Sequence, residues 1–143
     1  MLDECLGLAK MEKMTSSTIT KSYLISAPIE KVWQALVDPT IIHQWSDAPA
    51  KMTETVGGEF ELWDGDITGT NTTVEKPNRL VQEWQSGDWD KPSSVSILLQ
   101  PTDDHTEVSL VQTGHPESEQ KDLEEGWDSY YFGAIEKYFE AKP

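Results

Sequence analysis

One stretch of the sequence has the ligand spacing of a calcium-binding loop. Asp64, Asp66, Thr68 and Glu75 stand where an EF-hand loop places its oxygen ligands, and Gly69 stands where that loop has its turn glycine. An EF-hand also needs a helix on each side of the loop, whereas the sequence on both sides here is typical of β-strands. We therefore predict a hairpin at this place and no metal site.

The histidines and the cysteine offer little for catalysis. None of His43, His105 and His115 has a carboxylate or cysteine at metal-ligand spacing. Cys5 has no neighbour that would activate its thiol, and a single cysteine cannot form an intramolecular disulfide. We predict no catalytic residue and no cofactor from these side chains.

The aromatic residues are the more promising set, because large ligand sites are mostly apolar with a few polar groups. Most of these side chains are expected to fill the core, and some of them to form the wall of a cavity for an apolar ligand. Trp127, Tyr130 and Tyr131 are the first candidates for that wall. The full candidate set is Trp33, Trp45, Trp63, Trp84, Trp127, Tyr130, Tyr131 and Tyr138.

The helix predicted near residues 118–141 has an apolar arc that is expected to face the sheet, formed by Leu123, Trp127, Tyr130, Tyr131, Ala134 and Tyr138. A second apolar stripe, formed by Phe132, Ile135 and Phe139, lies beside this arc. It is a candidate partner or dimer surface. The alternative is that the N-terminal leucines Leu2, Leu6 and Leu8 cover it within the same chain.

Acidic residues open the same helix, and two of them, Glu124 and Glu125, are candidates for docking a basic partner. The simpler explanation is that negative charge at the start of a helix stabilises the positive end of its dipole.

These residues have to be positioned by a short list of elements. A strand comes first, then a helix that begins near Pro28 and ends at Asp38, and then a shorter helix through Trp45. Six strand-like runs follow, with Asp64-Gly65 as the strongest hairpin signal, before the long C-terminal helix. The predicted strands lie near residues 18–25, 51–56, 59–63, 66–75, 79–86, 93–101 and 105–113.

Length and charge exclude several classes of protein. The chain has 143 residues, 26 acidic and 11 basic, and a formal net charge of −15. Such a surface repels the phosphates of nucleic acids and of anionic membranes. No secretory signal and no long apolar run is present. We expect a cytoplasmic protein with one α+β domain over residues 18–143, preceded by a tail over residues 1–17.

Several segments resemble the family of the activator of heat-shock protein 90 ATPase. The resemblance is carried by APIEKVWQALVDPTIIHQW, VGGEFELWDGDITGT, NRLVQEWQ, VSLVQTGHP and EEGWDSYYFGAIEKYF, in which Gly126-Trp127 is the characteristic pair. It covers about residues 18–141, and across residues 58–139 it is closer to the C-terminal domain of the eukaryotic co-chaperone than to many bacterial members. It implies a START-like helix-grip fold, with a curved antiparallel sheet around a long C-terminal helix.

The resemblance implies a non-enzymatic binding protein with a chaperone or a client protein as its partner. In that family the activator has two domains, and the N-terminal one, for which this chain has no room, makes the main contacts with the chaperone. The alternative is a carrier or sensor of a small apolar molecule held between the sheet and the last helix. A third reading is a cyclase-like enzyme, whose polar residue would be Glu59, Glu61, Glu83, Gln82, Gln112 or one of the tyrosines of the last helix. The oligomeric state stays open.

Overall fold

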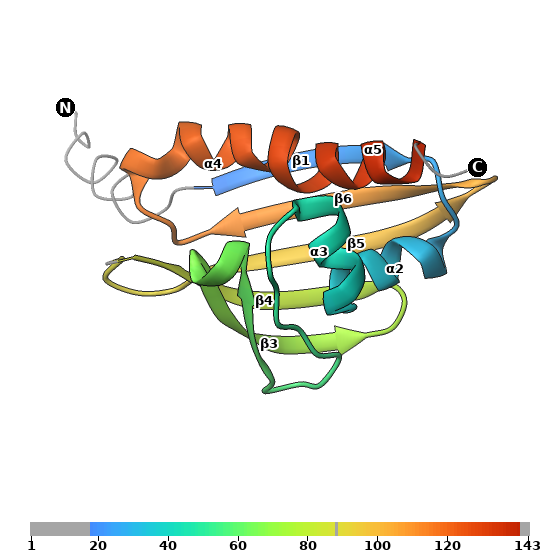
Figure 1. Cartoon of the computed structure of the whole chain (residues 1–143). Helices are drawn as coiled ribbons and strands as arrows, with labels where there is room; N and C mark the ends of the chain where they lie inside the picture. The colour runs from blue at the N-terminus through green and yellow to red at the C-terminus, as the bar shows by residue number, and fades with distance from the viewer. Residues whose placement is uncertain (1–17, 88, 141–143) are drawn as a thin grey trace, which may run out of the picture.

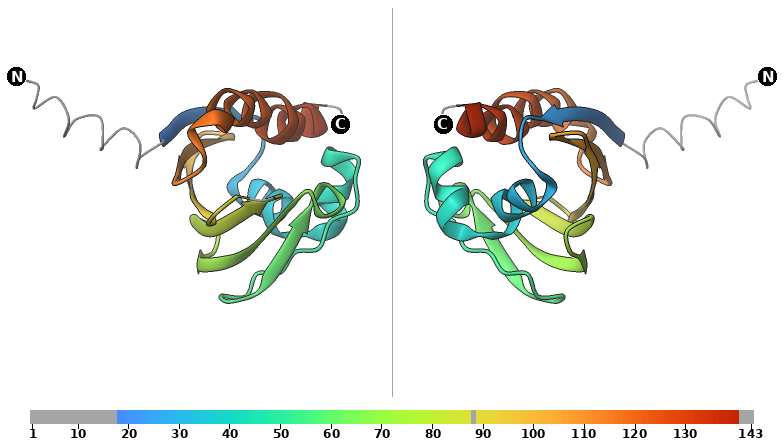
Figure 2. Two further views of the ribbon diagram at one scale, coloured as in Figure 1. Left: turned by 90° about the vertical axis from the view of Figure 1, so that its left-hand side faces the viewer. Right: turned by 90° about the vertical axis from the view of Figure 1, so that its right-hand side faces the viewer.

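A curved antiparallel sheet and a long C-terminal helical segment form the two layers of the fold (Figure 1). The computed structural model describes residues 18–87 and 89–140. The strand order is β1-β6-β5-β4-β3-β2, so β1 and β2 are the two edges. The end-on views show the sheet curling around the space that the helices fill, as the helix-grip expectation requires (Figure 2). The predicted tail, residues 1–17, lies outside the described residues.

The elements follow one another almost in the predicted order. The strands are β1 (Thr18–Ile25), β2 (Glu59–Leu62), β3 (Ile67–Glu75), β4 (Arg79–Ser86), β5 (Ser93–Thr102) and β6 (His105–Thr113). The helices are α2 (Ile29–Val37), α3 (Pro39–Ser46), α4 (Gln120–Gly126) and α5 (Phe132–Glu140). Short helical turns are η1 (Trp63–Gly65), η2 (Glu117–Glu119) and the π-helical η3 (Trp127–Tyr131).

The two short helices form where the sequence predicts them. Val32, Trp33 and Leu36 turn one side of α2 into the core and are fully buried. Asp38 ends α2 and caps α3, because its Oδ1 accepts hydrogen bonds from the backbone nitrogens of Thr40 at 2.9 Å and Ile41 at 3.4 Å. The Asp-Pro pair therefore fixes the corner between them.

The strand predicted over residues 51–56 is wrong. Only Lys51 forms an isolated bridge, with Glu61 on β2, and the chain beyond it runs as a loop. Side-chain hydrogen bonds hold this loop where backbone strand pairing was expected. The side-chain amide of Asn71 on β3 donates to the carbonyl oxygens of Thr53 at 2.7 Å and Thr55 at 3.4 Å. The alternation of residue types does not show that a side chain, and not strand pairing, holds this segment.

One row of residues crosses the inner face of the sheet and contains three buried amide side chains. In register across five strands, the row is Ile19, Gln112, Val95, Gln82 and Asn71. All five side chains are buried. Every buried amide in the row has hydrogen-bond partners, so the row costs little free energy in spite of its polarity.

The C-terminal helical segment contains a π turn that changes which side chains face the sheet. The backbone nitrogen of Phe132 donates to the carbonyl oxygen of Trp127, five residues earlier instead of four. One extra residue in a turn rotates everything after it by about 100°. Phe132 and Ile135 therefore enter the core, at 1% and 0% exposure, while Tyr130 turns outward at 66%.

This finding corrects the prediction of a partner surface on that helix. Phe132 and Ile135 are buried, and Phe139 is partly buried against the same core, so the three do not form an exposed stripe. Phe132 is covered within the chain by Tyr23 of β1, with ring centroids 4.9 Å apart. Cover by the N-terminal leucines falls outside the described residues.

Candidate functional site

An aromatic pocket of about 380 Å³ opens where the C-terminal helical segment crosses the ends of β3 and β4. The helical side is contributed by α4 and η3, and the sheet side by η1, β3 and β4. The size is within the range of small-molecule sites. The pocket is lined by Ser46, Trp63, Ile67, Trp84, Asp122, Leu123, Gly126, Trp127, Tyr130 and Tyr131.

Stacked rings make the floor of the pocket rigid. Trp84 and Trp127 stack with centroids 4.8 Å apart, and Tyr131 packs against Trp127 at 4.6 Å. Trp45 lies against the other side of Tyr131, at 4.9 Å. These four rings are at least nine-tenths buried, so they form a packed layer between sheet and helix, and the aromatic pocket opens beside it.

The indole nitrogens of the floor are held by the amide row. Trp127 Nε1 donates to Gln112 Oε1 at 2.8 Å, and Trp84 Nε1 donates to Gln82 Oε1 at 2.9 Å. The side-chain nitrogen of Gln112 donates a hydrogen bond to Ser93 Oγ, and that of Gln82 donates one to Asn71 Oδ1. Both tryptophans are thus fixed in orientation, and Gln82 and Gln112 are committed to structure, which leaves neither amide free for catalysis.

The rim presents two aromatic side chains to solvent. Tyr130 is 66% exposed because of the π turn, and Trp63 is half-buried on the opposite wall. Trp63 and Asp64 have positive φ values of 50° and 56°. A bulky residue rarely adopts this conformation, which costs on the order of 1–3 kcal/mol. The hairpin turn holds Trp63 at the rim against that cost.

Gly126 explains part of the opening, since a Cβ atom at this position would meet nothing within 4 Å. Gly133 has a different role. A Cβ atom there would come within 2.0 Å of the carbonyl oxygen of Asp128, so Gly133 permits the π turn. The two glycines thus serve the site in two ways, one by leaving space and one by shaping the helix.

Asp128 ties the π turn to the edge strand β1. Its carboxylate accepts hydrogen bonds from the hydroxyl of Tyr23 at 2.7 Å and from Lys21 Nζ at 3.0 Å. These two hydrogen bonds lower the pKa of the Asp128 carboxyl, whereas burial and the bond to Asp128 raise the pKa of Tyr23. Burial likewise raises the pKa of Tyr131.

The eight aromatic candidates divide into four groups. Trp63, Trp84, Trp127, Tyr130 and Tyr131 line the one pocket. Trp45 supports it from beneath, while Trp33 is buried in α2, and its Nε1 has no hydrogen-bond partner among the described residues. Tyr138 donates to Gln44 at 2.8 Å and lines a separate hollow near Pro28 and Phe139.

The acidic candidates lie at the start of the helix. Glu124 accepts a hydrogen bond from Gln120, and Glu125 is exposed. Sequence reasoning missed Ile67, Leu123 and Asp122 as pocket residues. Leucine and isoleucine at helical or alternating spacing give no signal that separates a pocket wall from ordinary core.

The calcium-loop match has the geometry of a hairpin. Asp64 lies in the turn η1, and Thr68, Gly69 and Glu75 lie within β3, which pairs with β2 and β4. Across residues 18–87 and 89–140 no cluster of three or more metal-binding side chains occurs. In the same ranges no helix combines the length and the apolar character needed to cross a membrane.

Comparison with known proteins gives one consistent family. The family described as Activator of Hsp90 ATPase homolog 1-like protein matches residues 26–140. The human activator of 90 kDa heat shock protein ATPase homolog 1 is 26% identical over 124 residues, 85% of this chain. The Dictyostelium discoideum homologue is 34% identical over 86 residues, 58% of this chain. The matched part is only 36% of the human protein and 22% of the Dictyostelium one.

A solved structure extends the likeness to the fold. The crystal structure titled as an HSP90 activator from Plasmodium falciparum superimposes with a TM-score of 0.76 and 26% identity. The match covers 88% of this chain and 96% of that one. With its family match over most of its length and the same fold, this chain belongs to the Activator of Hsp90 ATPase homolog 1-like protein family.

Proposed function

We propose that this protein is a non-enzymatic binding protein that assists a chaperone of the Hsp90 type. The observation that carries the proposal is the match to the Plasmodium falciparum HSP90 activator, which runs along nearly the whole of both chains. The names of the human and Dictyostelium relatives point the same way. Since this chain spans about a third of the human protein or less, the proposed role is that of the matching part alone.

The geometry of the aromatic pocket supports a role in protein binding. The stacked floor is rigid, and Tyr130 stands exposed on its rim. Tyrosine and tryptophan side chains supply much of the binding energy in protein interfaces, especially where they need no reordering on contact. Asp122 on the same rim adds a negative charge that suits a basic residue of the partner.

The test measures binding and ATPase stimulation of a purified Hsp90 by the full chain. We expect a complex, and Tyr130→Ala should weaken it about tenfold because a central aromatic contact is lost. Val56→Ala is the matched control, since Val56 is similarly exposed, at 60%, and does not line the pocket. If the unmodified chain neither binds Hsp90 nor changes its ATPase rate, the proposal fails.

The second candidate function is the carriage of a small apolar molecule. The pocket volume of about 380 Å³ and its aromatic walls favour it. Native and denaturing mass spectra of the purified protein should then differ by the mass of a bound molecule. Gly126→Leu should abolish that difference with the fold retained, because the new side chain would fill open space. Identical masses in both spectra would contradict the carrier function.

The enzyme reading has the least support from the pocket. It requires a buried carboxylate or histidine there, and the acidic side chain that lines the pocket, Asp122, is exposed. His115 is buried, and its Nδ1 has no hydrogen-bond partner in the described part of the chain. It does not line the pocket, however, and its Nε2 lies 2.6 Å from Gln120 Oε1.

A further inference from the structure

The outer face of β1, β6 and β5 is uncharged over nine adjoining positions. Three rows in register make up a three-by-three array, and eight of its nine side chains are exposed, with Ser96 half-buried. We call this array the neutral patch. Its rows are Thr18, Thr113 and Ser94; Thr20, Val111 and Ser96; and Ser22, Ser109 and Leu98.

The lack of charge is unusual for this molecule. Charged residues make up 26% of the sequence, and the net charge is −15. Charged residues are depleted at the centre of protein interfaces, where their desolvation would be costly. The two large apolar side chains in the patch, Val111 and Leu98, are 38% and 36% exposed and lie in neighbouring rows. The patch therefore has the composition of an interface centre.

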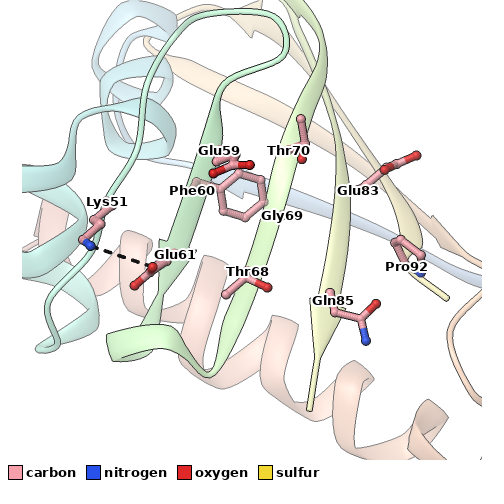
Figure 3. Close-up of a pocket in the computed structure, with 10 residues that line it drawn as sticks. All are labelled: Lys51, Glu59, Phe60, Glu61, Thr68, Gly69, Thr70, Glu83, Gln85 and Pro92. Atoms are coloured by element: carbon pink, nitrogen blue, oxygen red, sulfur yellow. Dashed lines mark ion pairs between the residues drawn. The ribbon is translucent and has the colours of Figure 1, made fainter. Parts of the chain in front are cut away.

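An acidic groove continues the first row of the patch across the rest of the sheet. Ser94 is paired with Glu83 on β4, and the same row runs through Thr70 to Glu59 on β2. The groove has a volume of about 630 Å³ on the outer face of β2, β3 and β4 (Figure 3). Its boundaries include Pro92 on one side and Lys51 on the other.

Glu59 and Glu83 are the free charges of this groove. Lys51 pairs with Glu61, at 3.8 Å, and no ion pair within residues 18–87 and 89–140 involves Glu59 or Glu83. Glu59 on β2 and Glu83 on β4 lie on either side of Thr70 on β3, so their backbone positions are two strand spacings or about 10 Å apart. That separation leaves room for one long cationic side chain between them.

We infer that the neutral patch and the acidic groove together form a docking surface for a partner protein that presents Lys or Arg beside an uncharged apolar strip. Charge complementarity in the groove would orient the partner, and the patch would supply the area that is buried. A second copy of this chain fits poorly, because each copy carries the same large negative charge. The inference holds whether or not that partner is a chaperone.

The test is a titration of the isotope-labelled full chain with a peptide that alternates lysine and threonine around a central valine, followed by amide chemical shifts. The shifts should concentrate on Thr70, Glu83 and Ser94. Removing both groove charges with Glu59→Gln and Glu83→Gln should lower the affinity for the peptide about fivefold. The control pair Asp103→Asn and Asp104→Asn removes the same charge from the exposed β5–β6 turn and should have little effect.

A second pair of variants tests the patch. Val111→Lys should weaken peptide binding, whereas Val56→Lys makes the same substitution at an exposed position outside the patch and the groove lining and should matter less. Equal losses in both acidic pairs would mean general attraction to an acidic protein and would overturn the inference. Shifts centred on the aromatic pocket, no shifts on this face, or shifts that follow protein concentration without peptide would overturn it as well.

Discussion

Asp128 is the residue at which the helix and the edge strand are joined. It sits in the π turn and accepts hydrogen bonds from Tyr23 and Lys21, both on β1. Lys21 also points a charge toward the inner side of an edge strand, a feature that opposes edge-to-edge pairing with other chains. This one carboxylate therefore supports the local helix geometry and the isolation of the sheet edge.

The lowered pKa of Asp128 predicts a loss of stability in acid. The carboxylate stabilises the folded state above its unfolded pKa of about 3.9, and that contribution disappears as the pH falls through the lower folded value. Urea unfolding at pH 7 and pH 3 should show a smaller pH response in Asp128→Asn than in the unmodified chain. The difference should be under about 1 kcal/mol, because this side chain is half-exposed.

The matched control for this measurement is Asp122→Asn, which removes an exposed carboxylate from the same helical segment. It should keep the pH response of the unmodified chain.

On the alkaline side, the raised pKa of Tyr23 predicts that stability falls as the pH rises past about 10, and Tyr23→Phe should reduce that fall. Equal pH responses in all four proteins would contradict this view of Asp128 and Tyr23.

At the scale of elements, strands were more predictable than the last helix. The bounds of β1, β4 and β6 agree with the predicted ranges. Each of these strands has one buried and one solvent-facing side, and the alternation of apolar and polar residue types indicates such a strand. The π turn has no such signal. Its extra residue depends on the close approach of Gly133 to the carbonyl oxygen of Asp128, which the sequence pattern does not show. The prediction therefore placed Phe132 and Ile135 on the wrong face of the helix.

The two helical glycines predict opposite effects of the same substitution. Gly133→Ala should destabilise the protein by about 2 kcal/mol or more, because the new methyl group would collide with a backbone oxygen. Gly126→Ala should stabilise it by up to about 1 kcal/mol, since the position is open and alanine favours helix. Thermal unfolding followed by circular dichroism compares the two. Similar changes in both variants would refute this account of the π turn.

At the scale of the whole molecule, electrostatic repulsion is an unfavourable feature. Acidic residues outnumber basic ones by 26 to 11, and only four ion pairs occur among residues 18–87 and 89–140. The compact state holds this excess of negative charge in a small volume, which costs free energy that salt reduces by screening.

The melting temperature should therefore rise by a few degrees between low salt and about 0.5 M NaCl. A variant that carries Glu124→Gln and Glu125→Gln has two fewer negative charges, so its melting temperature should respond less to salt. A melting temperature that falls with added salt would show that favourable ion pairs outweigh the repulsion.

The fold as a whole was predictable, and the site only in part. The order of elements and the family resemblance both gave the helix-grip arrangement, and five of the eight aromatic candidates line one pocket. The remaining three, Trp33, Trp45 and Tyr138, have the same residue types, but packing alone decides whether a ring forms a wall, a support or part of the core. The outer groove depends on strand register, which residue types do not fix.

The buried row of amides favours the native strand alignment over shifted ones. If a strand slips by one residue, apolar side chains turn to solvent, and the hydrophobic effect rejects the error. A slip by two residues keeps every side chain on its proper face, so burial alone cannot distinguish it from the native pairing. It would, however, separate Gln82 from Asn71, or Gln112 from Ser93 and Trp127, and leave buried polar groups unpaired. The glutamines that hold the two pocket tryptophans therefore also favour the native register of the sheet.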